Sequence, residues 1–362
     1  MTRTYDAIVV GLGAMGAAAT YQLAKAGANV LGIDRHDPPH DRGSSHGDSR
    51  ITRLAIGEGA HFVPLVKRSH ELWREIERET GATILTETGM LLIGAREAAV
   101  LHGAADFLAT TIAAAEEHGI EHERLTAADV ARRFPQFALG GDERGAYYEP
   151  TGGFVRPETA ITAQLKLARG HGAQTRTNER VRTVEGGRVT TDAGTYAARH
   201  VILAAGPWVN EFVPAGRFTV HRQVLYWFES DTPQEHEDMP IFIWELGTGP
   251  DDFFYGFPAV DGAVKLSTEE YERATTPDAC DRDVREDEWR RFHERFVKGR
   301  LRGVGERCVR ATTCLYTVTD DRDFVIEEHD EGVLLVSACS GHGFKHSAAI
   351  GEQVARRLAA AG

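Results

Sequence analysis

The segment 5–34 constrains the fold of this chain more than any other part of the sequence. Residues 7–10 (AIVV) are an apolar run with the length of one buried parallel strand. The sequence G-L-G-A-M-G follows, then a segment of small residues with helical character and a second apolar run that ends at Asp34. This order of strand, glycine loop, helix, strand and acidic residue is typical of a dinucleotide-binding site. It does not distinguish NAD from FAD.

The spacing of Gly11, Gly13 and Gly16 lets the chain turn tightly, approach a pyrophosphate and pack the helix on the strand. The helix N-terminus offers free N–H groups and the positive end of its dipole to a phosphate. Asp34 stands where a carboxylate accepts hydrogen bonds from a ribose hydroxyl.

Composition and charge exclude several classes of function. A chain of 362 residues is too long for one ordinary core, so we expect two domains. The formal net charge of -13 argues against a nucleic-acid or membrane partner, because either would need a basic surface. No apolar stretch is long enough to span a bilayer. The four cysteines form no CxxC pair, which argues against a disulfide framework or a metal site and suits the cytoplasm.

The remaining patterns predict helices over 62–80, 98–119, 157–172, 282–298 and the C-terminus, and strands within 84–94, 181–204, 223–267 and 324–338. A capping box at Thr126 predicts a short helix that ends near Pro135. The C-terminal strand, glycine loop and helix repeat the pattern of the N-terminus. We therefore expect one nucleotide-binding domain from residues 1–85, 145–215 and 310–362, and a second domain, built on an antiparallel sheet, from 86–144 and 216–309.

Three motifs carry chemistry: GSSHGDSRITR at 43–53, CLYT at 314–317 and SGHGFK at 340–345. The first lies in a long polar segment, and segments of this kind are usually functional or disordered. Its two arginines, Arg50 and Arg53, would lie on the same side if a helical turn begins there.

With these motifs in this order, the chain resembles the monomeric sarcosine oxidase and N-methyltryptophan oxidase family, within the FAD-dependent D-amino-acid-oxidase-like superfamily. The resemblance covers nearly the whole length. It implies an α/β protein whose Rossmann-like FAD-binding domain is assembled from discontinuous segments, with an inserted antiparallel-sheet (α+β) substrate domain. It also implies a monomer that oxidises a secondary amino acid, N-methyl or cyclic, with O2 as acceptor and hydrogen peroxide as product.

The resemblance implies that FAD is covalently bound through Cys314, which matches the cysteine bonded to the flavin 8α-methyl carbon. Its nearest rival is Cys339, which we expect to pack behind the C-terminal glycine loop. The residues assigned to cofactor binding on this basis are Gly11, Gly13, Met15, Gly16, Asp34, Arg35, Ser44, Val181, Gly206, Trp208, Cys314, Gly341, Gly343, Phe344 and Lys345.

Arg53 and Lys345 match the two cations that hold the substrate carboxylate in this family. An arginine grips a carboxylate with a planar fork, and a lysine adds a point charge. A surface salt bridge is the ordinary alternative for either, but the apolar, glycine-rich setting of Lys345 favours a site. Lys265 matches the lysine that activates oxygen beneath the flavin, with a structural salt bridge as its alternative.

Arg50 and His46 match residues that flank the flavin ring, where a cation could stabilise negative charge on the reduced flavin. Salt bridges that anchor the loop are the alternative for both. Tyr255 and Tyr316 match aromatic residues that line the substrate cavity, and plain core packing is the alternative for both.

One departure leaves the substrate open. Where sarcosine oxidases carry a histidine four residues after the oxygen-activating lysine, this chain has Glu269, which we place among the substrate-binding residues. Bulky side chains at 226, 227 and 244 also depart from the sarcosine-specific pattern. A larger or cationic amine is therefore one alternative. An NAD-dependent dehydrogenase would leave Cys314 without a role, and a flavin-binding subunit without turnover would not need Lys265.

Overall fold

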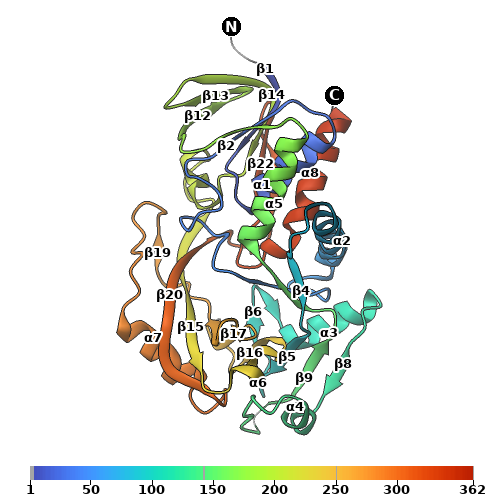
Figure 1. Ribbon diagram of the computed structural model, residues 1–362, viewed down its shortest axis with the longest axis vertical. Helices are drawn as coiled ribbons and strands as arrows, with labels where there is room; N and C mark the ends of the chain where they lie inside the picture. The colour runs from blue at the N-terminus through green and yellow to red at the C-terminus, as the bar shows by residue number, and fades with distance from the viewer. Residues whose placement is uncertain (1–3, 142, 250, 362) are drawn as a thin grey trace.

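The computed structural model describes residues 4–141, 143–249 and 251–361. The structure is a mixed α/β fold in which two large sheets lie at opposite ends of an elongated molecule (Figure 1). No helix within the described residues is long and apolar enough to cross a membrane.

The eight-stranded sheet is built around the first strand of the chain, as the N-terminal pattern predicts. Its parallel strands are, in spatial order, β11 (Gln174–Arg176), β2 (Val30–Ile33), β1 (Thr4–Val10), β14 (Thr195–Leu203) and β22 (Val333–Ser337). Antiparallel strands complete the sheet: β12 (Val181–Glu185), β13 (Arg188–Thr191) and β21 (Val325–Asp330). Because the carboxyl ends of the parallel strands share one edge, the loops that follow β1, β2, β14 and β22 meet there.

The long helices lie beside this sheet and against one another: α1 (Ala14–Lys25), α2 (Val63–Thr80), α5 (Pro157–Gly170) and α8 (Ser347–Ala361). Figure 1 shows α1 between α5 and α8. Small residues permit this close packing, since a Cβ on Gly351 would lie 2.5 Å from the carbonyl carbon of Ala18.

The nine-stranded sheet at the other end is mixed rather than wholly antiparallel, because β16 (Ile241–Glu245) pairs in parallel with β5 (Met90–Gly94). Its longest pairing joins β15 (Thr219–Ser230) to β20 (Val304–Val318). The other strands are β8 (Glu123–Leu125), β9 (Gly145–Glu149), β17 (Phe253–Gly256), β18 (Ala263–Ser267) and β19 (Ala274–Thr275). The helices near this sheet are α3 (Phe107–Glu117), α4 (Ala127–Arg133), α6 (Pro233–Glu237) and α7 (Glu286–Phe292).

The helix expected over 98–119 is wrong in its first third. A small hairpin, β6 (Val100–Leu101) and β7 (Ala104–Ala105), precedes α3. The turn residues His102 and Gly103 have φ values of 48° and 81°, as a two-residue hairpin turn requires. The charged helix expected over 282–298 is also shorter, because α7 gives way to a π-helical turn at His293–Val297. The capping box at Thr126 is confirmed.

A three-stranded sheet lies between the two large ones and joins β3 (Arg50–Thr52), β10 (Gly153–Val155) and β4 (Leu85–Glu87). Residues 50–52 are therefore a strand, not the helical turn considered for Arg50 and Arg53. β9 and β20 belong to the nine-stranded sheet, although the sequence assigns 145–149 and 310–318 to the nucleotide-binding segments. The domain boundaries remain predictions.

Candidate active site

A groove, here called the nucleotide groove, lies along the edge where the parallel strands of the eight-stranded sheet end. Most of the predicted cofactor residues line it: Gly11, Gly13, Met15, Asp34, Arg35, Ser44, Val181, Gly206, Trp208, Gly341, Gly343 and Phe344. Gly16 instead serves the packing of α1 on β1, because a Cβ there would lie 1.7 Å from the carbonyl oxygen of Gly11. Arg35 and Trp208 form part of the wall, where both bond to Asp278.

The groove fits a dinucleotide such as FAD. Gly11 has a φ of 89°, and a Cβ there would lie 2.4 Å from the carbonyl oxygen of Ala204, so the turn requires glycine. The N-terminus of α1 belongs to the groove wall, where its N–H groups suit a phosphate. Within the described residues, Ser44 Oγ is buried there without a hydrogen-bond partner. Asp34 accepts backbone N–H bonds from Leu12 and His36 and has lone pairs left for a ribose hydroxyl.

A second cavity, here called the inner cavity, adjoins the nucleotide groove. Arg50, Tyr316, Gly341 and Phe344 line both. The apolar wall of the inner cavity consists of Ile51, Leu225, Ile243, Phe253 and Phe257, and its polar lining includes Arg53, Glu58, His102, Tyr255, Lys265, Glu269, His342 and Lys345. The predicted catalytic and substrate residues thus gather in one place, except that His46 is not part of this lining.

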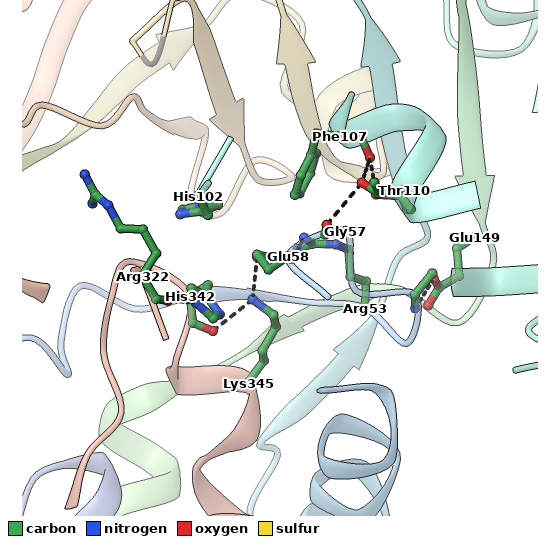
Figure 2. Close-up of polar contacts among 12 residues, drawn as sticks. Arg53, Gly57, Glu58, His102, Phe107, Thr110, Glu149, Arg322, His342 and Lys345 are labelled. Atoms are coloured by element: carbon green, nitrogen blue, oxygen red, sulfur yellow. Dashed lines mark hydrogen bonds and ion pairs between the residues drawn. The ribbon is translucent and has the colours of Figure 1, made fainter. Parts of the chain in front are cut away.

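Glu58 joins the two cations predicted to hold the substrate carboxylate. Its Oε2 lies 2.7 Å from Arg53 Nη2 and its Oε1 lies 3.0 Å from Lys345 Nζ. All three side chains are buried, and Figure 2 shows Glu58 between the two cations, with His342 beside Lys345. Burial would raise the pKa of Glu58, but Arg53 and Lys345 lower that pKa well below its usual value. Burial lowers the pKa of Lys345 to about 8, against the opposing effect of Glu58. Two cations share one resident anion, so the group keeps an affinity for another carboxylate.

The loop that carries Glu58 is held in place by its backbone. Buried Glu149 accepts N–H bonds from Leu54 at 2.6 Å and Ala55 at 3.0 Å. Thr110 on α3 donates its hydroxyl to the carbonyl oxygen of Gly57 at 3.1 Å (Figure 2). Contacts from both β9 and α3 therefore fix the position of Glu58, and through it the position of the two cations that it pairs with.

Lys265 projects from β18 and is fully enclosed. Its ammonium group donates to the carbonyl oxygens of Gly47 at 2.6 Å and Ser49 at 2.7 Å, and to Ser49 Oγ at 3.1 Å. Burial, followed by the charge of Arg50, lowers the pKa of Lys265 well below its usual value. No acidic side chain lies within ion-pair distance in the described part of the chain, which argues against the structural salt bridge considered for it.

Arg50 links the loop 43–53 to the cysteine predicted to bind the flavin. Its Nη2 lies 2.7 Å from the carbonyl oxygen of Ser44 and 3.2 Å from Cys314 Sγ. Cys339 belongs to the groove lining, contrary to the expectation that it packs behind the glycine loop. Burial, with a further effect of Arg50, lowers the pKa of His46 to about 3, so of His46 and Arg50 only Arg50 is a cation at neutral pH.

The remaining predicted residues form the far wall of the inner cavity. Burial raises the pKa values of Tyr255 and Tyr316, so both phenols are neutral hydrogen-bonding groups. Glu269 is 4% exposed and accepts the hydroxyl of Tyr271 at 2.5 Å. Its Oε1 lies 3.5 Å from Nε2 of His102. Burial raises the pKa of Glu269 to about 8.

Comparison with known proteins agrees with this geometry. Residues 6–357 match the family described as FAD dependent oxidoreductase. The chain belongs to this family. It is 36% identical to the monomeric sarcosine oxidase of Streptomyces avermitilis, over 98% of this chain and 94% of that protein. It is also 36% identical to an N-methyl-L-tryptophan oxidase of Yersinia pestis, over 97% and 94%.

Solved structures of similar fold include NikD, described as an unusual amino acid oxidase essential for nikkomycin biosynthesis. NikD superposes on this FAD-dependent oxidoreductase with a TM-score of 0.85 and 26% identity, over 100% of this chain and 95% of that one. An L-proline dehydrogenase from P. horikoshii shares the fold, with a TM-score of 0.80 at 20% identity. The expected enzyme class, a sarcosine-oxidase-like FAD-dependent oxidase acting on CH–NH bonds, is confirmed. The NAD-dependent alternative is excluded by the family, and the flavin-binding subunit without turnover by the enzyme class.

Sequence reasoning missed three residues of this oxidoreductase's inner cavity: Glu58, His102 and His342. Glu58 stands five positions after Arg53, and this spacing of opposite charges was the available signal. His102 was assigned to the first part of the helix expected over 98–119, where the structure has the β6–β7 hairpin instead. His342 lies inside the motif SGHGFK, where only the glycines and the lysine drew attention.

Proposed function

We propose that this oxidoreductase oxidises secondary amino acids, N-methyl or cyclic, and binds their carboxylate between Arg53 and Lys345. The observation that supports the proposal is the buried pair of cations that shares one resident carboxylate in a cavity adjoining the nucleotide groove. Charged side chains are buried only with partners, and a bidentate arginine with a lysine suits a carboxylate. The flavin, when bound, accepts a hydride from the carbon beside the substrate nitrogen and passes its electrons to oxygen.

Several residues then have distinct tasks. Arg53 and Lys345 hold the substrate carboxylate, and Glu58 keeps their side chains in place before the substrate arrives. Tyr255 and Tyr316 line the cavity and exclude water from the reacting carbon. Lys265 presents a positive charge to oxygen. The imine product is released and hydrolysed by water, so an N-methyl substrate yields formaldehyde and a primary amine.

We also propose that the FAD is attached through Cys314. The contacts of Arg50 support this assignment, because its Nη2 lies 3.2 Å from the sulfur and 2.7 Å from the carbonyl oxygen of Ser44, a residue of the nucleotide groove. The bond from Cys314 Sγ to the 8α carbon forms with loss of one hydrogen from each partner, and oxygen takes up both hydrogens. A monomeric state and a cytoplasmic location remain predictions.

The test is a screen of purified holoenzyme against matched amines. The panel contains sarcosine, N-methyl-L-alanine, L-proline and N-methyl-L-tryptophan, each beside its carboxamide and its primary-amine counterpart. We expect peroxide from one or more secondary amino acids and much less from the carboxamides, with formaldehyde from the N-methyl compounds. Equal turnover of acids and carboxamides, or peroxide from primary amines alone, would contradict the proposal.

A further inference from the structure

Glu269 is the second buried carboxylate of the inner cavity, and its surroundings differ from those of Glu58. Glu58 is paired with two cations, whereas the ion-pair neighbour of Glu269 among the described residues is His102. Burial lowers the pKa of His102 to about 3, so its ring is neutral and does not compensate a charge on Glu269. The cavity therefore has one carboxylate paired with two cations and one that, among the described residues, has no lysine or arginine within ion-pair distance.

Three parts of the chain hold Glu269 at the cavity wall. Tyr271, on the same segment, donates its hydroxyl to Oε2 at 2.5 Å. His102 reaches Oε1 from the turn of the β6–β7 hairpin, where a φ of 48° turns the chain sharply. Gly341 closes the arrangement, since a Cβ there would lie 3.1 Å from the His102 ring and 3.2 Å from the Tyr271 hydroxyl. Contacts from three parts of the chain thus hold the carboxylate of Glu269 in one position at the cavity wall.

A buried carboxylate without a cation does not stabilise a fold. Ionising it in the folded protein costs free energy, which is why the pKa of Glu269 is raised to about 8 by burial. The titratable and charged groups that face it are His102 from the hairpin, Tyr271, Tyr316 on β20, Arg322, Glu58 and Lys345. Such a group is explained when a ligand supplies the missing charge.

We propose that Glu269, positioned by Tyr271 and His102, binds a positively charged nitrogen of the amino-acid substrate, in the same inner cavity as the carboxylate-binding pair Arg53 and Lys345. This inference rests on the proposed function and adds the second polar contact of the substrate. The nitrogen is either the reacting secondary amine or an ammonium group on the substrate side chain. A cation that binds beside protonated Glu269 displaces its proton to solvent.

Two substrates of equal shape distinguish these sources. Nα-methyl-L-ornithine and N-methyl-L-norleucine differ only in whether the side chain ends in an ammonium or a methyl group. If the side-chain ammonium binds, the wild type prefers the ornithine derivative by about ten- to a hundredfold in kcat/KM, as one charge-assisted contact requires. Glu269→Gln then removes the preference. If the reacting amine binds, Glu269→Gln lowers kcat/KM for both substrates equally and removes the rise of kcat/KM with pH near 8 that ionisation of Glu269 causes, while the fall that loss of the Lys345 charge causes remains.

Glu245 offers a matched control. It is also a buried glutamate, at the end of β16 and 1% exposed, and burial raises its pKa to about 7, but it lines a separate cavity. We expect Glu245→Gln to leave the preference and the pH profile of the wild type unchanged. Retention of both in Glu269→Gln as well would overturn the inference.

A binding measurement on the wild type tests the contact at Glu269 without substrate oxidation and without the Glu269→Gln variant. Calorimetry on the anaerobic wild-type holoenzyme, with its flavin reduced beforehand by dithionite so that neither compound is oxidised, in buffers of different ionisation enthalpy at pH 7, reports proton release on binding either compound. We expect release with the ornithine derivative alone for side-chain binding and with both compounds for binding of the reacting amine. Binding of both without proton release, or failure of both to bind, would reject a cation contact at Glu269. Proton release on binding, together with no peroxide from the same compounds in the aerobic assay, would reject the proposed oxidase function and not the cation contact.

Discussion

Glu58 Oε1 lies 3.0 Å from Lys345 Nζ, although 287 positions separate the two residues in the chain. The contact joins the loop after β3 to the short helical turn before α8, and so ties the two ends of the sequence together at the inner cavity. Arg53 completes the group from the other side. Because a substrate carboxylate has to enter this group, its composition leads to the first two predictions.

Arg53→Gln should raise KM for the preferred amino acid by about ten- to a hundredfold, since a charge-assisted hydrogen bond contributes roughly 1.5–3 kcal/mol. The flavin spectrum should change little, because Arg53 lines the inner cavity and not the nucleotide groove. Steady-state kinetics with the acid and its carboxamide check this. Arg68→Gln is the control, because Arg68 pairs with Glu352 away from the cavity. An unchanged KM in Arg53→Gln would remove this arginine from carboxylate binding.

Carboxylate affinity should fall as pH rises through about 8. Lys345 has a lowered pKa of about 8, so its ammonium is charged below that pH and becomes neutral above it. The attraction for a carboxylate is therefore present at pH 7 and weakened at pH 9. Titration of the flavin spectrum with propionate, which carries no amine of its own, measures this directly. Lys345→Met should bind propionate weakly with no such pH step. A wild-type affinity that is constant from pH 6.5 to 9.5 would contradict the role of Lys345.

Cys314→Ser should lose covalently bound flavin. Arg50 bonds to the sulfur at 3.2 Å, and a hydroxyl in its place cannot form the thioether. The check is fluorescence of the denatured protein on a gel, which the wild type should keep and the variant should lack. Cys339→Ser is a sharp control, because Cys339 lines the nucleotide groove itself. Retained fluorescence in Cys314→Ser and loss in Cys339→Ser would reassign the attachment.

The nucleotide-binding end of the fold could be predicted from sequence because its signals are local. The strand, glycine turn and helix that end at Asp34 need only neighbouring residues to be recognised, and most of the predicted cofactor residues do line one groove. The family resemblance then located Arg53, Lys265 and Lys345, which the structure brings into one cavity. Arg53 and Lys345 could be named because each lies in a motif with its own spacing, and Lys265 because the resemblance extends beyond the motifs over nearly the whole chain.

The contacts that were missed depend on the tertiary fold. The alanine-rich composition of 98–119 favours a helix, but the turn at His102 and Gly103 interrupts it and directs the histidine to Glu269. Glu58 meets its second partner, Lys345, only because the chain returns through the strand β22 to the same cavity. The parallel pairing of β5 with β16 has the same origin, since about 150 residues separate them and no local pattern encodes strand direction.

Lys265 should serve the oxygen half of the reaction. Its ammonium group is held by Gly47 and Ser49 oxygens at 2.6–3.1 Å in the inner cavity, with no carboxylate in ion-pair contact in the described ranges. Burial lowers the pKa of Lys265, but three oxygen acceptors match the three N–H donors of an ammonium group, so we expect a charge that is available to an anion that forms nearby. A cation about 4 Å from oxygen stabilises a developing negative charge by roughly 4 kcal/mol at an effective dielectric near 20. The effect arises only as that charge develops, so it lowers the barrier and does not merely strengthen binding.

Lys265→Met removes the charge and keeps most of the side-chain volume. Reduction of the enzyme by substrate without oxygen should change modestly, whereas reoxidation should slow by about a hundredfold or more, as several kcal/mol requires. Stopped-flow absorbance measures the two steps separately. Lys298→Met, at an exposed lysine paired with Glu294, controls for the loss of a lysine charge. Reoxidation of Lys265→Met as fast as the wild type would mean that Lys265 only joins β18 to the loop at Gly47 and Ser49. The charge that assists oxygen would then have to come from another cation. Arg50 would be the first to test by the same measurement.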